Sequence, residues 1–235
     1  MRKVFIDTET TGLDPKLGHR IVEIAAVEMY NRQLTGRHFH YYLNPERESE
    51  ASALQIHGLT SEFLQDKQKF RDICAAFLDF IEGAELLIHN APFDVGFLDH
   101  ELGLVKQLPL KNYCSEISDT LVIAKEIHPG KRNNLDALCE RYQIDNSKRT
   151  LHGALMDAEL LAEVYLAMTR GQESLLMELD ITPLSIDSAV IAENLHLIIL
   201  PAGEKELELH SQQLENIDKE SKGKCLWKQH VAFSS

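Results

Sequence analysis

At 235 residues the chain is long enough for one sizeable domain, or for one domain with an appendage. Its 44% hydrophobic and 26% charged residues are ordinary for a soluble globular protein. The four cysteines are far apart and form no CxxC pair, which argues against a disulfide framework or a zinc ribbon and fits a reducing compartment. No apolar run suffices for a signal peptide or for the roughly 18 residues of a membrane span, so we expect a cytoplasmic protein without membrane contact.

The net charge of −13 argues against an extended surface for binding duplex nucleic acid. Residues 1–171 contain 19 Lys and Arg against 26 Asp and Glu, a net of −7, whereas residues 172–235 contain 5 against 11, a net of −6. If four acids of the first segment bind metal, that segment is only mildly acidic. This charge suits an enzyme that binds a few terminal nucleotides.

The first predicted element is a buried strand that delivers two carboxylates. Residues 4–6 are apolar and run into Asp7-Thr8-Glu9, after which residues 10–12 turn the chain. Because side chains alternate along a strand, Asp7 and Glu9 point to the same face. Two buried carboxylates this close resist ionisation unless a cation lies between them, which favours a divalent metal site. A solvated strand end with two acids is the alternative.

Later segments alternate between strand and helix patterns. Residues 21–30 and 37–43 predict strands that form an antiparallel meander with the first. Residues 56–60 predict a loop, with Thr60 capping a short helix. Further along the chain we expect strands at 84–88 and 113–117 and helices at 70–81, after the cap Asn90, after Asp119-Thr120, at 135–142 and at 150–167.

This order predicts the α/β class, with a mixed β-sheet of antiparallel meander plus parallel strands, flanked by helices. The periodic pattern fades past Gly171. We therefore expect a domain at 1–171, a linker at 172–180 and a tail at 181–235.

Two more acids and a histidine follow strand or loop ends. Asp94 falls in the first turn of a predicted helix, where it either binds metal or only stabilises the helix dipole. Asp157 lies on a predicted helix, and a solvent-exposed acid is its simplest alternative. His152 would lie roughly 140° from Asp157 on one helix, so the two converge only if His152 precedes the helix, which Gly153 permits. Otherwise His152 is a surface or capping residue.

The motifs occur in a fixed order: DTETTGLDP at residues 7–15, QIHGLT at 55–60, HNAPFD at 89–94 and HGALMDA at 152–158. The ordered set resembles the DEDDh 3′–5′ exonucleases, and most closely the proofreading epsilon subunits of bacterial DNA polymerase III. The resemblance spans nearly the whole predicted domain. It implies a ribonuclease-H-like exonuclease fold and a metal-dependent 3′–5′ exodeoxyribonuclease in the bacterial cytoplasm.

Phosphodiester hydrolysis needs an activated water and a way to absorb charge on the leaving oxygen, and two divalent ions about 3.5–4 Å apart supply both. Oxygen ligands suit Mg²⁺ or Mn²⁺. The resemblance implies that Asp7 bridges both ions, that Glu9 and Asp157 complete one site, and that Asp94 serves the other directly or through water. A histidine, with an unperturbed pKa of about 6.5, suits proton transfer near neutral pH, and His152 is the expected general base.

The resemblance also implies a pocket for the 3′-terminal nucleotide of single-stranded or frayed DNA. Its expected lining is Thr8, Thr11, Ile56 and His57, with the metal-binding Asp7, Glu9 and Asp157 also contacting the substrate.

The segment after the domain resembles the pentapeptide with which bacterial replication proteins bind the sliding clamp. It reads Gln172-Glu173-Ser174-Leu175-Leu176, with Gln172, Ser174, Leu175 and Leu176 as the expected contacts. An exposed peptide of this kind places apolar side chains in a pocket and anchors them with a polar group. The frayed end of the preceding helix is the alternative.

The tail, 181–235, is too short to bury a core of its own. It contains the apolar run 195–200, the chain's one tryptophan, Trp227, and Leu207, Leu214 and Ile217 at helical spacing. These features indicate a segment that folds on a partner, unless it packs on its own nuclease domain. The resemblance implies that this partner is the catalytic (alpha) subunit of DNA polymerase III, with a small theta-like subunit as a further partner.

Three functional classes follow. The first is a proofreading exonuclease subunit of a replicative DNA polymerase. The second is a free-standing RNase-T-like or oligoribonuclease-like exoribonuclease, against which the long tail argues. The third is a non-catalytic structural subunit, against which the intact set of four acids and a histidine argues.

Overall fold

The computed structural model describes residues 1–147, 151–170, 202–221, 223 and 227. These residues fall into two compact units, one within residues 1–180 and one within residues 181–235. The strand-like run 195–200 and the pentapeptide 172–176 lie outside the described residues.

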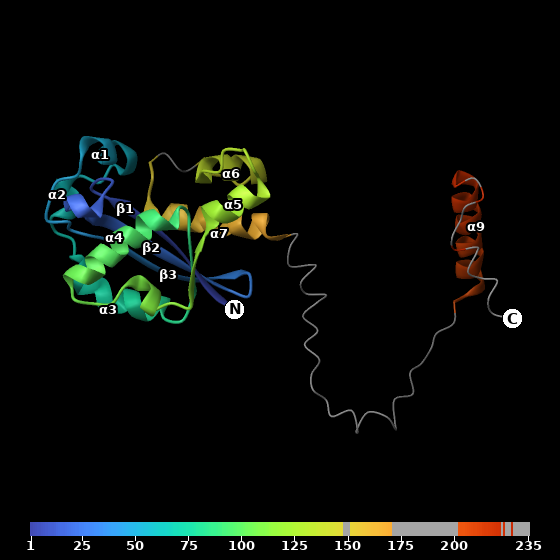
Figure 1. Ribbon diagram of the computed structural model, residues 1–235, viewed down its shortest axis with the longest axis horizontal. Helices are drawn as coiled ribbons and strands as arrows, with labels where there is room; N and C mark the ends of the chain where they lie inside the picture. Colours follow the sequence, from blue (N-terminus) through green and yellow to red (C-terminus); the bar gives the residue numbers. More distant parts are fainter. Residues whose placement is uncertain (148–150, 171–201, 222, 224–226, 228–235) are drawn as a thin grey trace, which may run out of the picture. The chain divides into compact units, whose positions relative to one another are not determined.

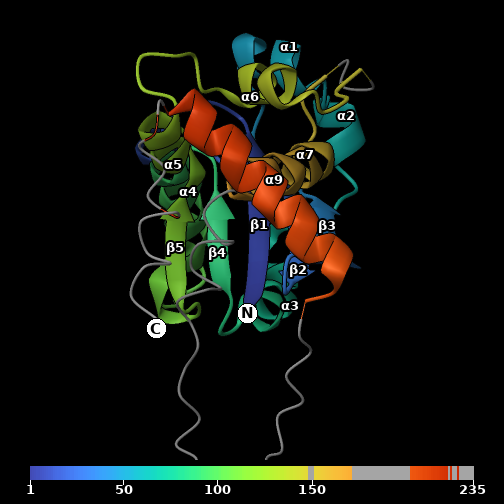
Figure 2. The same ribbon diagram turned by 90° about the vertical axis from the view of Figure 1, so that its right-hand side faces the viewer.

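The first unit is built on a five-stranded mixed sheet in the order β3-β2-β1-β4-β5. Figure 2 shows these strands side by side. The antiparallel part is the meander of β1 (Arg2–Thr10), β2 (Ile21–Tyr30) and β3 (Gln33–Tyr42). Two short strands, β4 (Glu85–Ile88) and β5 (Glu116–Asp119), add to β1 in parallel. The expected α/β class and mixed sheet are confirmed.

Helices cover both faces of this sheet (Figure 1). On one face, α3 (Phe70–Ile81) and α4 (Ala91–Leu104) pack against Val4 and Ile6 of β1. On the other, Phe5 packs against α7 (Ala154–Met168). The alternation of β1 therefore directs Asp7 and Glu9, which share the face of Phe5, towards α7, and Thr8 towards α4.

The remaining elements of the first unit are short connections around the sheet. They are the 3₁₀ turns η1 (Pro15–Leu17) and η2 (Leu110–Asn112) and the helices α1 (Ala51–His57), α2 (Ser61–Leu64), α5 (Thr120–Ile127) and α6 (Leu135–Tyr142). As expected, Thr60 caps α2 by accepting a hydrogen bond from the backbone N–H of Phe63. Asn134 caps α6 in the same way, by accepting a hydrogen bond from the backbone N–H of Ala137.

The expected loop at 56–60 is wrong at its start, because Ile56 and His57 form the last turn of α1. Seven residues are too few to display helical periodicity, and the cap position, Glu50, makes no side-chain cap bond. Gly58 ends the helix at φ 71°, a left-handed conformation that glycine adopts without strain.

The expectation that Asn90 caps α4 is also wrong. Asn90 occupies the cap position, but its backbone is left-handed, at φ 67°, and its side chain makes no cap bond. Its backbone N–H instead donates to Oδ1 of Asp119, and the same oxygen caps α5 through the N–H of Leu121. One carboxylate at the end of β5 thus organises the starts of two helices.

Three of the element boundaries that differ from those expected shift by three residues or more. β3 begins at Gln33 rather than 37, and β5 begins at Glu116 rather than 113, because η2 ends at Asn112 and residues 113–115 form a turn. The last helix of the domain begins at Ala154, not at 150. His152 therefore precedes the helix, which is the arrangement that its approach to Asp157 requires.

The second unit contains α9 (Glu204–Glu220), the helix expected from the spacing of Leu207, Leu214 and Ile217. Leu207 and Ile217 are exposed, as is Trp227. Among the described residues of the whole chain, no helix is both long and apolar enough to cross a membrane.

Candidate active site

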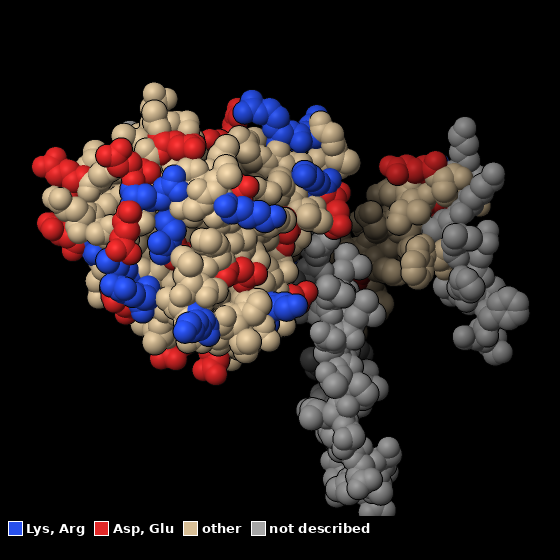
Figure 3. Space-filling model, turned by 60° about the vertical axis from the view of Figure 1, so that its left-hand side comes forward, with Lys and Arg blue, Asp and Glu red and all other residues tan. Residues whose placement is uncertain are grey.

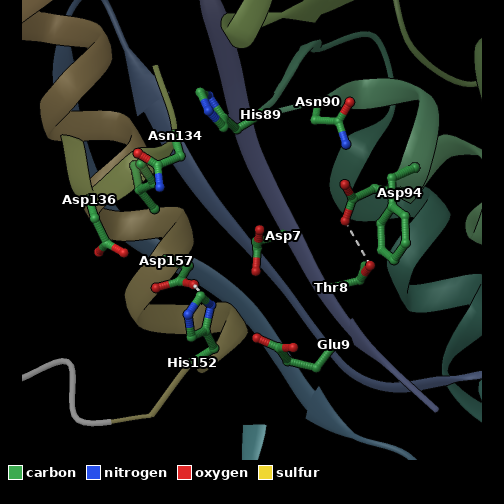
Figure 4. Close-up of a pocket in the computed structure, with 12 residues that line it drawn as sticks. Asp7, Thr8, Glu9, His89, Asn90, Asp94, Asn134, Asp136, His152 and Asp157 are labelled. Carbon is green, nitrogen blue, oxygen red and sulfur yellow. Dashed lines mark hydrogen bonds and ion pairs between the residues drawn. The ribbon is translucent and has the colours of Figure 1, made fainter. Parts of the chain in front are cut away.

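The candidate site lies where the carboxyl end of β1 meets the starts of α4 and α7 (Figure 4). It is a pocket of about 230 Å³. All five residues expected to carry the chemistry line it, together with neighbours of Asp7 and Asp94 in the chain and residues 134–136 at the start of α6. The lining residues are Asp7, Thr8, Glu9, His89, Asn90, Phe93, Asp94, Asn134, Leu135, Asp136, His152 and Asp157.

His152 and Asp157 meet at the start of α7. Nδ1 of His152 lies 3.5 Å from Oδ2 of Asp157. The Asp157 side chain is buried, whereas 45% of the His152 side chain is exposed, so the imidazole can exchange protons with solvent. Glu9 joins them, since one ligand atom from each of Glu9, His152 and Asp157 lies within 4.8 Å of the others.

Asp94 approaches from α4 on the other side of β1. Its Oδ1 accepts a 2.7 Å hydrogen bond from the hydroxyl of Thr8. Burial raises the pKa of Asp94 to about 7, although the bond from Thr8 opposes the shift. A carboxyl group buried in this way ionises readily only when positive charge is close, so the environment of Asp94 favours a bound cation.

The donor set fits divalent metal ions. Asp7, Glu9, Asp94 and Asp157 offer carboxylate oxygens to one pocket, and hard cations such as Mg²⁺ and Mn²⁺ prefer such oxygen ligands. No cysteine lines this pocket, whereas zinc sites commonly contain sulfur or several histidines.

A second pocket, of about 210 Å³, adjoins the first and shares Thr8, Glu9 and Phe93 with it. Its walls are mainly apolar. The lining residues are Thr8, Glu9, Thr10, Gly12, Leu13, Ser52, Ala53, Ile56, His57 and Phe93. Of the expected pocket residues, Thr8, Ile56 and His57 lie here. Thr11 does not line the pocket; it is fully buried behind it, and its hydroxyl lies 3.1 Å from Nδ1 of His19.

The loop that carries His152 is attached to this second pocket. The backbone N–H of His152 donates a 3.1 Å hydrogen bond to the carbonyl oxygen of Ile56. Leu151 packs over Gly58, where an added Cβ would lie 2.7 Å from Cδ1 of Leu151. Helix α1 thus contributes to the second pocket and to the support of His152.

Several lining residues were not predicted from the sequence. Ser52 and Ala53 were missed because α1 was not predicted, and Leu13 because it lies in the loop after β1, where only a turn was expected. Asn134 and Asp136 were missed because the sequence around them indicated only a helix at 135–142. An asparagine before a helix is an ordinary cap, so it gave no signal for the site.

Of the other predicted binding residues, Gln172, Ser174, Leu175 and Leu176 lie outside the described part of the chain. Their role stays a prediction.

Comparisons with known proteins agree with this geometry. The family model described as "Exonuclease" matches residues 4–165. Among solved structures, the nuclease domain of 3′hExo, a DEDDh family member bound to rAMP, aligns with a TM-score of 0.63 at 18% sequence identity, over 73% of this chain and 92% of that one. At that identity the likeness concerns the fold, and the expected ribonuclease-H-like exonuclease fold is confirmed.

Two curated relatives match along nearly their whole length. The DNA polymerase III subunit epsilon of Salmonella typhimurium (strain LT2) is 48% identical over 237 residues, which is 97% of each chain. The subunit of the same name from Escherichia coli (strain K12) is 46% identical over 237 residues, again 97% of each chain. The chain is therefore a 3′–5′ exonuclease, and it belongs to the family of DNA polymerase III epsilon subunits.

Proposed function

We propose that this exonuclease removes mispaired 3′-terminal nucleotides from DNA and releases nucleoside 5′-monophosphates. The observation that carries the proposal is the convergence of Asp7, Glu9, Asp94, His152 and Asp157 on one pocket. Chance does not readily bring four carboxylates and a histidine from β1, α4 and the start of α7 together. The similarity to epsilon subunits along 97% of the chain supports DNA, rather than RNA, as the substrate.

We assign the metal of this site as two Mg²⁺ or Mn²⁺ ions. Asp7, in the middle of the pocket, is the residue that would contact both; Glu9 and Asp157 would hold one, and Asp94 the other, directly or through water. Bound ions lower the pKa of the attacking water and stabilise charge on the leaving 3′ oxygen.

His152 acts as the general base. It removes a proton from the water whose oxygen attacks the terminal phosphorus, while the bond from phosphorus to the 3′ oxygen breaks and that oxygen takes up a proton from solvent. Asp157, next to Nδ1 of His152, orients the ring and stabilises it once it is protonated. The exposure of His152 allows the proton to return to solvent before the next cycle.

The second pocket receives the terminal nucleoside. Leu13, Ile56 and Phe93 provide apolar surface for a base, while Thr8 and His57 provide polar contacts. A base that is paired cannot enter such a pocket, so a frayed or mispaired end is the preferred substrate. This is the physical basis for proofreading.

The surface charge is compatible with a partner that presents the DNA. On the face shown in Figure 3, Lys and Arg side chains are interspersed with Asp and Glu. The tail provides the link to that partner, the polymerase catalytic subunit, and α9 exposes Leu207 and Ile217 for the contact. A sliding clamp bound through 172–176 and a small theta-like subunit complete the proposed assembly, which is cytoplasmic.

The deciding experiment measures nucleotide release from three labelled primers in Mg²⁺: DNA with a paired 3′ end, DNA with a mispaired 3′ end, and RNA. We expect the mispaired DNA end to be trimmed fastest. Faster trimming of RNA than of either DNA end would favour an RNase-T-like or oligoribonuclease-like enzyme instead. No hydrolysis of any primer would indicate a structural subunit.

A further inference from the structure

We propose that His19 is a positioning residue that joins two elements of the nucleotide pocket and fixes the distance between them. The two elements are the loop after β1, which contributes Gly12 and Leu13, and helix α1, which contributes Ser52 and Ile56. The proposal rests on the proposed function, because it takes this pocket as the site of the terminal nucleoside. His19 itself lines neither of the two pockets of the site and acts through its neighbours.

Both ring nitrogens of His19 are engaged. Nδ1 lies 3.1 Å from the hydroxyl oxygen of Thr11, and Nε2 lies 3.1 Å from Oε1 of Glu50. Only 4% of the His19 side chain is exposed. Since Thr11 follows β1 and Glu50 immediately precedes α1, the ring bridges the two elements.

The main chain closes this connection. The backbone N–H of Glu50 donates a 2.8 Å hydrogen bond to the carbonyl oxygen of Thr11. Thr11 also exchanges hydrogen bonds with Arg20, whose N–H donates to the Thr11 hydroxyl at 3.0 Å. Thr11 is therefore held between His19 and the next strand, and is not available to substrate.

One arrangement of protons satisfies this cluster with a neutral ring. Because the Thr11 hydroxyl accepts from Arg20, its own hydrogen can point at Nδ1 of His19. The Nε2–H of His19 then donates to the Glu50 carboxylate. The tautomer is assigned from the hydrogen-bond network, and it leaves neither ring nitrogen without a partner.

The ring also supports the pocket loop by direct packing. A Cβ added to Gly12 would lie 2.3–2.6 Å from three ring atoms of His19. A buried ring that is bonded at both nitrogens cannot rotate away, so the position requires glycine. The close contact lets the imidazole hold the backbone of Gly12, which lines the pocket.

Loss of His19 should therefore affect binding more than chemistry. Without the bridge, only the backbone bond of Glu50 to Thr11 joins the loop to the start of α1, so the two can shift and the pocket holds the nucleoside less tightly. The carboxylates on β1, α4 and α7 keep their supports, since none depends on His19 in the contacts above.

The test compares four proteins in full-length form: the parent, His19→Phe, Glu50→Gln and His128→Phe. His19→Phe keeps a ring behind Gly12 but removes both hydrogen bonds, whereas Glu50→Gln keeps an acceptor for Nε2–H. His128→Phe is the matched control, because His128 bonds the hydroxyl of Tyr142 at 2.7 Å and lines neither pocket of the site. The readouts are the Kd for thymidine 5′-monophosphate with Mg²⁺, by calorimetry, and kcat and KM on single-stranded DNA.

For His19→Phe we expect Kd and KM to rise about tenfold, equivalent to about 1.4 kcal/mol, with kcat within about threefold of the parent. Glu50→Gln and His128→Phe should stay close to the parent. If His19→Phe does not fold, Glu50→Ala, which removes one link at a half-exposed residue, should raise Kd in the same direction.

A folded His19→Phe protein with the Kd and KM of the parent would overturn the proposal, and so would a His19→Phe protein in which only kcat falls. A rise of Kd in His128→Phe equal to that in His19→Phe would also overturn it. For the fallback variant, a parental Kd in Glu50→Ala would do the same. The parent's own activity on 3′ DNA ends tests the proposed function separately, so the two failures are distinguishable.

Discussion

Thr8 and Asp94 are joined by a buried 2.7 Å hydrogen bond that connects β1 to α4. The alternation of β1 explains it: Asp7 and Glu9 face α7, so Thr8 between them faces α4. The bond brings the predicted ligand Asp94 to the same pocket as the acids of β1. Burial, which this bond opposes only in part, favours the neutral form of the Asp94 carboxyl when no cation is bound.

The buried Asp94 should therefore lower the free energy of unfolding of the metal-free protein as the pH rises. Burial raises its pKa from 3.8 to about 7, so between these values the unfolded chain has released the proton while the folded protein retains it. The free energy of unfolding then falls from about pH 4 to pH 7. Asp94→Asn removes this titration and keeps an acceptor for Thr8.

Thermal denaturation in chelator at pH 8 checks this. Asp94→Asn should melt at a higher temperature than the parent, by roughly 2–4 °C for each kcal/mol gained. At pH 4 the two proteins should melt alike, and added Mg²⁺ should raise the melting temperature of the parent more than that of the variant. A variant that is less stable than the parent at pH 8 would show that the ionised carboxylate of Asp94 stabilises the metal-free fold, which contradicts the raised pKa.

His152→Ala should lose most of the hydrolysis rate. Removing a general base typically costs ~10²–10⁴-fold. The variant should remain slow at every pH tested. The measurement is a pH–rate profile on single-stranded DNA, with His128→Ala as a histidine control outside the site. A His152→Ala rate within about threefold of the parent would assign His152 to structure.

The core of the fold and the chemistry of the site follow from local patterns in the sequence. β1 is predictable because an apolar run ends in turn residues, and the meander because its strands are rich in β-branched and aromatic residues. Helix geometry gave only a condition for His152, which reaches Asp157 if it precedes the helix; the helix expected from residue 150 would have included it.

The walls of the nucleotide pocket could not be predicted in this way. Helix α1 is short and is held by contacts between distant residues, such as the hydrogen bond of Glu50 to Thr11. The left-handed backbone of Asn90 depends on Asp119, which is far along the chain. Such tertiary contacts leave no periodic pattern in the sequence. Residues whose positions depend on them therefore cannot be predicted from single segments.

The pentapeptide after the domain makes a separate prediction. Changing Gln172, Leu175 and Leu176 together to Ala should weaken binding to the sliding clamp, because the apolar anchors and the polar contact are lost. Hydrolysis of a small nucleotide ester should be unchanged. Surface plasmon resonance against the immobilised clamp measures the first effect. Equal clamp affinity before and after the change would return this stretch to the alternative, a helix end.

The tail should carry the contact with the polymerase catalytic subunit. A chain ending at residue 171 should retain nuclease activity but no longer co-elute with that subunit on a sizing column. The fragment 172–235 alone should still co-elute with the subunit. In the full chain, Leu207→Asp with Ile217→Asp should have the same effect, since both lie on one face of α9. Gln212→Asp is the control for the added charge, because Gln212 is exposed and lies roughly 140° around the helix from both Leu207 and Ile217. Co-elution of 1–171 as complete as that of the full chain would contradict the assignment.

The central claim is that the carboxylates around Asp7 hold divalent ions that make the hydrolysis of 3′ ends possible. The most direct measurement is nucleotide release from single-stranded DNA by the parent and by Asp7→Ala, each with Mg²⁺, with Mn²⁺ and with excess chelator. We predict release by the parent with either ion, none in chelator, and none by Asp7→Ala under any condition although the variant remains folded by circular dichroism. Full release in chelator, or by the folded Asp7→Ala protein, would contradict it.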